Sequence, residues 1–454
     1  MEETKKEMTE ATGEQTVEQT GEVHEHVHHH THGEHHHHHH HHHRHRSHRK
    51  KKNAQKGEKV ARFFRQNKKY LLYSVIAIVL ACCLLLLGGY LDRQGVFHHK
   101  GDDKPQGGQN VTAHTLQLSV PYFAEEVTIV GPAVAEFTKA APDVAVSAVY
   151  ERYRVANARL DVGLAVKLSY ELSDLPSGIK VTSARFLVSE DAELREPQVY
   201  TPAEHQTAVD VYHLKTATAY YYRVDLTFSD GNVASVGGNF RTADTPRVLT
   251  VDGVYNLRDI GGWKTVSGTR VKQGLLYRGC ELDGAVEEKY TITPDGVHTM
   301  LSVLGIKTDM DLRLASDNVY GTNALGVGVK HSYYEAPMYS AVFDNAEKVR
   351  AIFADLAVES NYPVYLHCTY GQDRTGTICY LLEALLGVEE ESLMKDYQLS
   401  GLHHGGVSMN EMSEFVGRLK GLSGGTMQQK VEGYLLSIGV TAEEIAAIRH
   451  IFLE

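Results

Sequence analysis

The chain has 454 residues, enough for two or three domains with cores of their own, and its formal net charge at pH 7 is -11. The charge is unevenly distributed, because residues 44–69 hold twelve Lys or Arg against the single Glu58. The rest of the chain is therefore more acidic than the total, which argues against a nucleic-acid partner. Five cysteines are too few and too scattered for a disulfide framework.

Residues 1–69 begin with a stretch rich in Glu, Thr and Gln and continue into a histidine tract, HVHHHTHGEHHHHHHHHHRHRSHR. This composition cannot bury a core, so the sequence predicts a disordered, basic tail. The tract is either a flexible chelator of Zn²⁺ or Ni²⁺ or a low-complexity segment or tag without that function. Its irregular spacing, mixed with Glu, Val and Arg, argues against a simple tag.

Residues 70–91, YLLYSVIAIVLACCLLLLGGYL, form a run of 22 residues without a charge. As a helix the run spans about 33 Å, against about 30 Å of hydrocarbon in a bilayer. The sequence predicts one uncleaved transmembrane helix, because the run is long, far from Met1, and lacks a small-residue cleavage site. Basic residues precede the run and few follow it, a bias that keeps the N-terminus in the cytoplasm and everything after Leu91 outside the cell.

Residues 92–111 are rich in Gly and in charge, which favours a flexible linker. Residues 112–245 then consist of short alternating runs, such as GLAVKLSYEL and AYYYRVDLTF, separated by turn signals such as DLPSG and SDGN. This pattern predicts an antiparallel β-sandwich. Such a domain is more often a spacer or a surface for a protein partner than a catalyst.

Within this region, LKTATAYYYRV followed by FSDGN and FRTADTP resembles the second half of a fibronectin type III domain. The resemblance is best over residues 160–245 and implies that the hydroxyl of Tyr220 braces the corner of the sandwich. Thr216 stands where that pattern often has Pro. The run of tyrosines is alternatively a ligand-stacking patch, although a strand with one buried face explains it more simply.

Residues 248–454 alternate strand-like and helix-like runs, which predicts an α/β domain with a central, mainly parallel sheet flanked by helices. The predicted strands include GIKTDMDLR and YPVYLHC, and RTGTICYLLEALLG is a predicted helix that Gly387 ends. Cys368 therefore follows a strand and precedes a helix, which is where open α/β sheets bind ligands. Taken alone, Cys368 is better explained as a small buried apolar residue, because a free cysteine usually behaves as a buried hydrophobe, so its neighbours must decide.

The loop CTYGQDR carries the groups that an anion requires. Backbone amides from Thr369 to Arg374 can converge on one phosphate, Gly371 permits a tight turn, and the helix dipole adds positive potential. Arg374 supplies a planar fork for two phosphate oxygens. The same positive field favours the thiolate form of Cys368, and Thr375 can donate its hydroxyl to that sulfur.

The stretch HCTYGQDRTG resembles the HCxxGxxR(S/T)G loop of cysteine-dependent protein tyrosine phosphatases. Other landmarks resemble one bacterial branch of tyrosine and phosphoinositide phosphatases, whose loop is HCxxGKDRTG: NLRDIGGW, GLLYRGCEL, LGIKTDMDLR, DYQLS and YLLSIGVTAEEIAAIR. The resemblance covers residues 248–454, nearly the whole predicted domain.

This resemblance implies hydrolysis of phosphate monoesters without a metal or other cofactor. Cys368 attacks phosphorus to give a thiophosphoryl intermediate, Arg374 and the loop amides hold the oxygens, and water then releases phosphate. In this branch the Asp within the loop is the proposed general acid, and it maps onto Asp373. Asp344, in SAVFDNAEK, is the alternative, because related phosphatases carry a mobile acid loop there.

The residues expected to contact substrate are Thr369, Tyr370, Gly371, Gln372 and Arg258. Gln372 replaces the Lys of the branch, which is associated with recognition of additional phosphates on inositol lipids, so a phosphotyrosine-like monoester becomes the leading expectation. Arg258 and Arg313 either line the pocket or brace strand ends in ion pairs. Cys280 is either a resolving thiol for an oxidised nucleophile or a buried structural residue.

The sequence therefore predicts a single-pass membrane protein of a bacterial cell surface, with an outward-facing protein-tyrosine phosphatase domain and phosphorylated proteins or small molecules as substrates. Two alternatives stay open. One is a phosphoinositide or inositol phosphate phosphatase, and the other is a surface adhesion or binding protein whose phosphatase-like domain is inactive. The intact set of Cys368, Asp373, Arg374 and Thr375 favours an enzyme.

Overall fold

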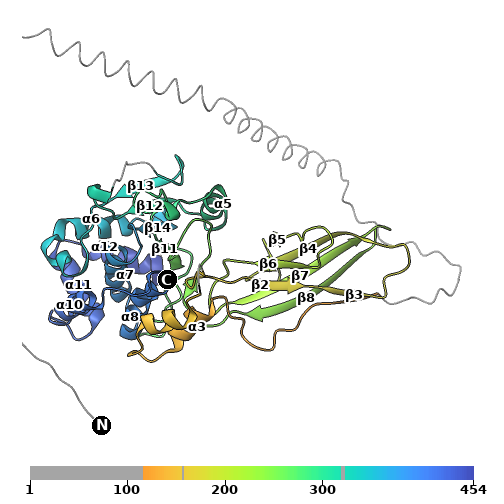
Figure 1. The fold of residues 1–454 in the computed structure, drawn as a ribbon, viewed down its shortest axis with the longest axis horizontal. Coiled ribbons are helices and arrows are strands. Elements are labelled where there is room, and N and C mark those ends of the chain that lie inside the picture. Colours follow the sequence, from red (N-terminus) through yellow and green to blue (C-terminus); the bar gives the residue numbers. More distant parts are fainter. Residues whose placement is uncertain (1–115, 156–157, 318–322, 454) are drawn as a thin grey trace, which may run out of the picture. The chain divides into compact units, whose positions relative to one another are not determined.

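The computed structural model describes residues 116–155, 158–317 and 323–453. The predicted tail at residues 1–69, the predicted transmembrane helix at 70–91 and the predicted linker at 92–111 lie outside these ranges. Within these ranges, no helix has both the length and the apolar character needed to cross a bilayer. All of these described residues belong to one compact unit, drawn as a ribbon in Figure 1.

The described residues before position 245 contain the antiparallel strands that the alternating pattern predicts. The strands pair in three sheets. Two sheets have two strands each: β1 (Gln117–Ser119) pairs with β3 (Glu171–Ser173), and β2 (Val166–Ser169) pairs with β6 (Ala208–Val211). The third sheet has the order β5 (Gln198–Tyr200), β4 (Val181–Ser189), β7 (Ala219–Phe228) and β8 (Val233–Arg241). One face of these strands forms a common apolar core with Phe186, Val224 and Leu226. The resemblance to fibronectin type III stays a prediction.

Tyr220 occupies the bracing position that the resemblance implies. Its hydroxyl accepts a hydrogen bond from the backbone N–H of Lys215 at 2.9 Å, and its ring stacks on Phe240 with the centroids 5.5 Å apart. Alternate residues of β7 are buried, so that Tyr220 and Tyr222 point inward while Tyr221 between them is only half-buried. The tyrosine-rich run is therefore explained by a strand with one buried face.

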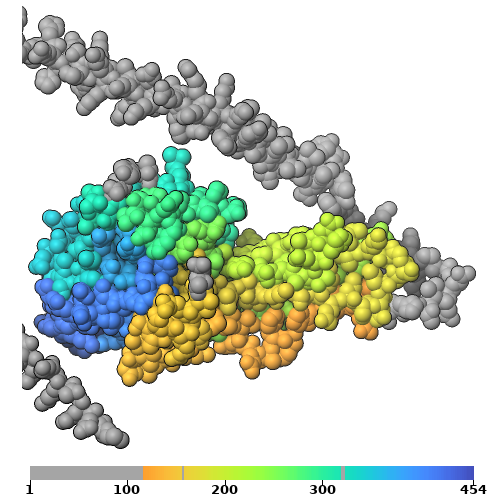
Figure 2. Space-filling view, in the orientation of Figure 1, coloured from red at the N-terminus to blue at the C-terminus, as the bar shows by residue number. Residues whose placement is uncertain are grey.

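Two helices interrupt the region that the sequence assigned to the sandwich, and that part of the prediction is wrong. They are α3 (Pro132–Lys139) and α4 (Val146–Tyr153), and α3 starts with Pro at a position where a helix tolerates the missing N–H. Their apolar residues recur at helical spacing and pack against the C-terminal part of the chain: Val134, Phe137, Val146 and Val149 share one cluster with Val248, Leu399 and Leu402. Figure 2 shows the two helices, in gold, against that blue C-terminal part.

The C-terminal region is built on the mixed sheet that positions Cys368. Its strands lie in the order β13 (Lys330–Tyr333), β12 (Thr308–Asp311), β14 (Val364–His367), β11 (Leu276–Gly279), β10 (Arg258–Asp259) and β9 (Arg247–Val248). The first four strands are parallel, and β10 and β9 extend the sheet in antiparallel fashion. The prediction of a central, mainly parallel sheet is confirmed, with β14 between two parallel neighbours.

Helices and single turns cover both faces of this sheet. The helices are α5 (Pro294–His298), α6 (Ala346–Leu356), α7 (Asp373–Leu385), α8 (Glu390–Leu399), α9 (Gly401–His404), α10 (Met409–Lys420), α11 (Met427–Ser437) and α12 (Ala442–Leu453). Short 3₁₀ or π turns lie at Glu288–Tyr290 (η1), Thr299–Val303 (η2), Ala315–Asp317 (η3), Tyr339–Asp344 (η4) and Glu359–Asn361 (η5). Val364 and Leu366 of β14 face one core and Tyr365 faces the other, as expected for a strand buried on both sides.

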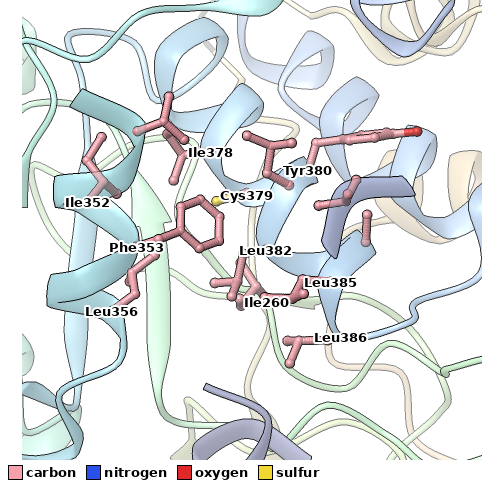
Figure 3. Close-up of a cluster of buried hydrophobic side chains, with 14 of the residues drawn as sticks. Ile260, Ile352, Phe353, Leu356, Ile378, Cys379, Tyr380, Leu382, Leu385 and Leu386 are labelled. Atoms are coloured by element: carbon pink, nitrogen blue, oxygen red, sulfur yellow. The ribbon is translucent and has the colours of Figure 1, made fainter. Parts of the chain in front are cut away.

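Helix α7 is anchored deep in the larger core. Figure 3 shows Ile378, Leu382 and Leu385 of α7 among the buried side chains that also include Ile352 and Phe353 of α6. The helix ends at Leu385, and Gly387 follows with φ +80°, a conformation that favours glycine. The strand, the helix and its stop therefore agree with the sequence prediction, and they fix both ends of the loop that begins at Cys368.

Candidate active site

Cys368 is the first residue after β14, and the loop that follows it leads directly into the N-terminus of α7. Its side chain is 4% exposed. Gly371 in this loop has φ +66°, and a Cβ atom there would lie 2.2 Å from the carbonyl oxygen of Gly279. Only glycine fits this position, so the tight turn predicted at Gly371 is a requirement of the packing.

Three consecutive carbonyl groups of the loop are held by groups around it. The backbone N–H of Glu281 donates to the oxygen of Thr369 at 2.9 Å. Asn256 donates from its side chain to Tyr370 at 3.1 Å, and Arg278 donates from Nη2 to Gly371 at 2.9 Å. In a trans peptide the C=O and the next N–H point in opposite directions, so these contacts turn the following amides toward the other side of the loop. Converging amides at a helix N-terminus make a site for an anion.

A buried group of charges lies beneath the loop. Arg258 and Arg278 both pair with Asp396, and all three side chains are almost fully buried. Burial raises the pKa of Asp396, but the two guanidinium groups outweigh that effect and the pKa is lowered. Glu383 on α7 is also buried, and burial together with Asp396 holds its pKa well above the usual range. Two cations therefore face one ionised carboxylate, which leaves a positive charge under the loop.

Arg258 is the one predicted substrate-binding residue whose position requires a correction. Its side chain is 2% exposed, its Nε donates to Asp396 at 2.8 Å, and its Nη1 donates to Asn256 at 2.6 Å. The guanidinium is thus enclosed under the loop, where it braces β10 against α8. Arg313 likewise forms ion pairs with Asp311 and Asp283. Arg258 and Arg313 therefore both brace the ends of strands.

Arg374, the predicted phosphate fork, is held by a carboxylate that the sequence analysis did not consider. Its Nη1 donates to Oδ2 of Asp317 at 2.7 Å, and the two side chains are 16% and 20% exposed. The same Oδ2 accepts from the backbone N–H of Leu314 at 3.0 Å. Asp317 is therefore fixed by its own turn and can fix Arg374 in place.

Thr375 is fully buried in the first turn of α7. Among the residues that the structure describes, its hydroxyl has no hydrogen-bond partner. A buried hydroxyl usually has one. The predicted donation from Thr375 to the sulfur of Cys368 would satisfy this group.

Asp373, the predicted general acid, is the first residue of α7 and lies in a network of hydroxyl and amide donors. The hydroxyl of Tyr339 donates to its Oδ1, and the side-chain amide of Gln372 donates to the same oxygen at 3.1 Å. Tyr339 in turn bonds to the hydroxyl of Tyr397 at 2.8 Å. Burial, together with the hydrogen bond to Asp373, raises the pKa of Tyr339, so this phenol stays a donor.

Asp344, the alternative acid, lies at the opposite end of η4 from Tyr339 and is exposed. Five residues of 3₁₀ helix correspond to about 10 Å. The intervening Val342 accepts a hydrogen bond from Tyr434 of α11, which directs that end of the turn toward α11. Burial raises the pKa of Tyr434 on α11, and the charge of nearby Asp344 raises it further, whereas Asp373 directly follows the loop at the start of α7.

His367, the residue before the nucleophile, is buried against β12. Its Nε2 lies 3.0 Å from Asp309, and its Nδ1 lies 3.2 Å from the carbonyl oxygen of Cys368. Burial lowers the pKa of His367, but Asp311 and Asp309 outweigh it and raise the pKa to about 9. His367 is therefore an imidazolium at neutral pH, paired with Asp309.

The remaining predicted contacts surround the outer part of the loop. Thr369 is buried, and Gln372 is 9% exposed because its amide is turned toward Asp373. Tyr370 is half-buried, and its hydroxyl donates to Glu287 at 3.1 Å. The ring of Tyr370 packs edge-to-face against Tyr290 and His404.

Cys280 and Cys379 have the character of structural residues. Burial raises the pKa of both thiols, to about 12 for Cys379. The sulfur of Cys280 accepts from the backbone N–H of Tyr255 at 3.2 Å, and Cys379 lies within the core shown in Figure 3. Among the described residues, no group of three or more His, Cys, Asp or Glu is arranged to hold a metal ion, and the histidine tract lies outside them.

Comparison with known proteins agrees with this geometry. Residues 249–454 match the family described as the tyrosine phosphatase family. This part of the chain is similar to tyrosine phosphatases. A tyrosine-protein phosphatase of Nostoc commune is 23% identical over 207 residues, covering 34% of this chain and 69% of that protein. A Cupriavidus necator protein assigned as a tyrosine-protein phosphatase is 25% identical over 197 residues, covering 37% of this chain and 68% of that protein.

Among solved structures, the core catalytic domain of a PP-IP phosphatase from S. cerevisiae, in complex with citrate, is similar to this chain at 14% identity. The match covers 36% of this chain and 84% of that structure's chain, with a TM-score of 0.22.

Several residues that support the loop from Cys368 to Arg374 were not foreseen: Asp317, Tyr339, Arg278, Asn256 and Glu287. Arg278 and Asn256 stand in the landmarks GLLYRGCEL and NLRDIGGW, so the resemblance marked their segments without marking their roles. Asp317, Tyr339 and Glu287 stand outside every quoted motif, and no pattern in the sequence distinguishes them.

Proposed function

We propose that this chain is a membrane-anchored, outward-facing phosphomonoester phosphatase that removes phosphate from tyrosine in proteins through a cysteine nucleophile. The observation that carries the proposal is the loop from Cys368 to Arg374, which combines a buried thiol, a helix N-terminus and an arginine held by Asp317. The match of residues 249–454 to the tyrosine phosphatase family supports the class of reaction.

In the first step the sulfur of Cys368 attacks phosphorus, the P–S bond forms and the bond to the leaving oxygen breaks. Asp373 gives its proton to that oxygen, so the product leaves as a neutral alcohol or phenol. In the second step water attacks phosphorus and gives a proton to Asp373, while the P–S bond breaks and returns the thiolate. Arg374 and the loop amides stabilise the charge on the three equatorial oxygens in both steps.

The substrate class is inferred from the surface of the loop. Gln372 supplies no cation for a second phosphate, and its amide is directed to Asp373. Tyr370 offers an aromatic face beside the loop. These features favour a single phosphate on a phenol. The curated relatives are themselves described as tyrosine-protein phosphatases, which points to the same class.

The location is inferred from the sequence alone. Residues 70–91 are long and apolar enough to span a bilayer, and the basic residues before them favour a cytoplasmic N-terminus. With that orientation the phosphatase domain acts outside the cell.

The activity test uses the purified full chain in detergent with a chelator present. Release of phosphate is measured from phosphotyrosine peptides, phosphoserine peptides and phosphoinositides, and each assay is repeated with Cys368→Ser. We expect turnover of the phosphotyrosine peptides and loss of that turnover in the variant. Activity that survives Cys368→Ser rejects the mechanism. Preference for phosphoinositides favours the lipid alternative, and binding of orthovanadate without turnover favours an inactive binding module.

The topology test treats intact cells with protease. We expect loss of the phosphatase domain and survival of an epitope placed within residues 1–69. Protection of the phosphatase domain in intact cells, with digestion after lysis, rejects the outward orientation while leaving the activity untouched.

A further inference from the structure

The segment before the phosphatase domain is fastened to it by specific contacts. Lys395 of α8 donates from Nζ to the carbonyl oxygens of Thr138 and Ala140, both at 2.9 Å, at the end of α3. The hydroxyl of Thr250 bonds to both the N–H and the carbonyl of Gly163, at 3.0 and 2.9 Å. These contacts, together with the apolar cluster around α3 and α4, bring residues 158–163 beside the residues that hold the catalytic loop in place.

Asp161 is the residue of this segment that reaches furthest inward. Its side chain is 5% exposed, and its Oδ2 accepts a hydrogen bond from the backbone N–H of Asn256 at 2.6 Å. The same oxygen lies 3.5 Å from Nδ1 of His403 and 3.5 Å from Nη2 of Arg159. Burial raises the pKa of Asp161, but the hydrogen bond to His403 and the charge of Arg159 outweigh it and lower the pKa to about 2. The carboxylate is therefore ionised throughout the neutral range.

Asn256 connects this carboxylate to the loop. It has φ +51°, which is unusual for a residue with a side chain, so its backbone must be held in place. Its Nδ2 donates to the carbonyl oxygen of Tyr370 and to the hydroxyl of Ser400, both at 3.1 Å. Its Oδ1 accepts from Nη1 of Arg258 at 2.6 Å. The backbone of Asn256 thus binds Asp161, while its side chain binds the catalytic loop.

We propose that Asp161 is a positioning residue for the catalytic loop, acting through Asn256, so that the working catalytic unit includes a segment that precedes the residues matched by the family. Holding the N–H of Asn256 fixes the direction of its side chain, and that side chain fixes the peptide between Tyr370 and Gly371. The N–H of that peptide then points to the side of the loop where phosphate is expected to bind. The inference rests on the proposed function for its meaning in catalysis, although the contacts themselves do not depend on it.

The experiment compares three variants of the full chain with the wild type. Asp161→Ala removes the acceptor, Asp161→Asn keeps an oxygen that can accept from Asn256, and Lys395→Met is the matched control. Lys395 fastens the same segment through α3 but does not contact the loop. Each variant is assayed for kcat and KM on a phosphotyrosine peptide, for alkylation of Cys368 by iodoacetamide at neutral pH, and for protection of that thiol by orthovanadate.

For Asp161→Ala we expect kcat to fall by about 10- to 100-fold with a smaller change in KM, because small displacements of catalytic groups cost rates of this size. Alkylation of Cys368 should slow and protection by orthovanadate should weaken. Asp161→Asn should recover most of both properties. Lys395→Met should stay within about twofold of wild type in both, since it lies outside the loop's network.

Two results overturn the proposal. One is a folded Asp161→Ala protein with wild-type kcat and wild-type alkylation of Cys368. If Asp161→Ala does not fold, the proposal is instead overturned by an Asp161→Asn protein that loses kcat while alkylation and protection of Cys368 are unchanged. The other is Lys395→Met losing as much as Asp161→Ala, which would indicate general loosening of the segment. If the wild type hydrolyses no monoester, the proposed function fails, while the alkylation and orthovanadate measurements still decide the role of Asp161.

Discussion

The ion pair between Arg374 and Asp317 determines how the predicted phosphate fork is aimed. Asp317 engages only Nη1 of the guanidinium, and its own oxygen is held by the N–H of Leu314. Among the residues that the structure describes, none forms a hydrogen bond to Nε or Nη2, so that edge of the guanidinium can bind two oxygens of a phosphate. We predict that Asp317 and phosphate bind Arg374 together, so that Asp317→Asn weakens catalysis.

The size of the effect follows from the geometry of the pair. The atoms are 2.7 Å apart and both side chains are mostly buried, so the contact is a charge-assisted hydrogen bond. Such bonds contribute about 1.5–3 kcal/mol, and some exposure of both groups places this one near the lower end. Because each 1.36 kcal/mol is about tenfold in rate, Asp317→Asn should lower kcat/KM by about tenfold.

The assay measures kcat and KM on p-nitrophenyl phosphate and on a phosphotyrosine peptide. Arg374→Lys is the reference, and we expect it to lose more activity than Asp317→Asn because lysine removes the planar fork itself. A rise in kcat/KM for Asp317→Asn would refute the reasoning, since it would mean that the carboxylate competes with substrate for Arg374.

Two further predictions concern Asp373, the proposed acid, and His367, the residue before Cys368. Asp373→Asn should lower kcat by about 100-fold on substrates with poor leaving groups and much less on p-nitrophenyl phosphate, whereas Asp344→Asn should leave both rates nearly unchanged. His367 has its pKa raised from 6.5 to about 9, so its ionic contribution to stability is complete below pH 6.5 and is lost as the pH rises toward 9. Asp309→Asn should flatten that decline in thermal unfolding measured from pH 6 to about 9.5, and an unchanged decline would contradict the assignment.

The part of the site that could be predicted is the part that is continuous in sequence. The strand before Cys368, the loop with Gly371 and the helix stopped by Gly387 lie within one short stretch, where local rules of strand, turn and helix apply. Each of these rules reports on neighbours in the chain. The structure accordingly places these elements where the sequence indicated.

The supports of the loop could not be predicted because their partners are distant. Arg258 was taken as a substrate contact, and its actual partner Asp396 is 138 residues away. A charged residue in a sequence shows what it can bind but not which opposite charge the fold brings to it. Asp317 is a single carboxylate in a turn, and only the packing of η3 against α7 brings it to Arg374.

The two helices before the sheet were missed for a different reason. Each of them has eight residues, so the helical period repeats only about twice. Isolated helices of this length are marginal in water, and α3 and α4 depend on the apolar surface of α8 and α9 for their stability. That surface is formed by residues far along the chain, which a local pattern does not register.

Gln372 bears on the substrate that the loop can accept. Its amide donates to Asp373 instead of extending from the mouth of the site. A lysine at this position could offer a full positive charge to a second phosphate, whereas the neutral amide is already bound to the carboxylate and offers none. The orientation of Gln372 therefore agrees with the proposal of a substrate that carries a single phosphate.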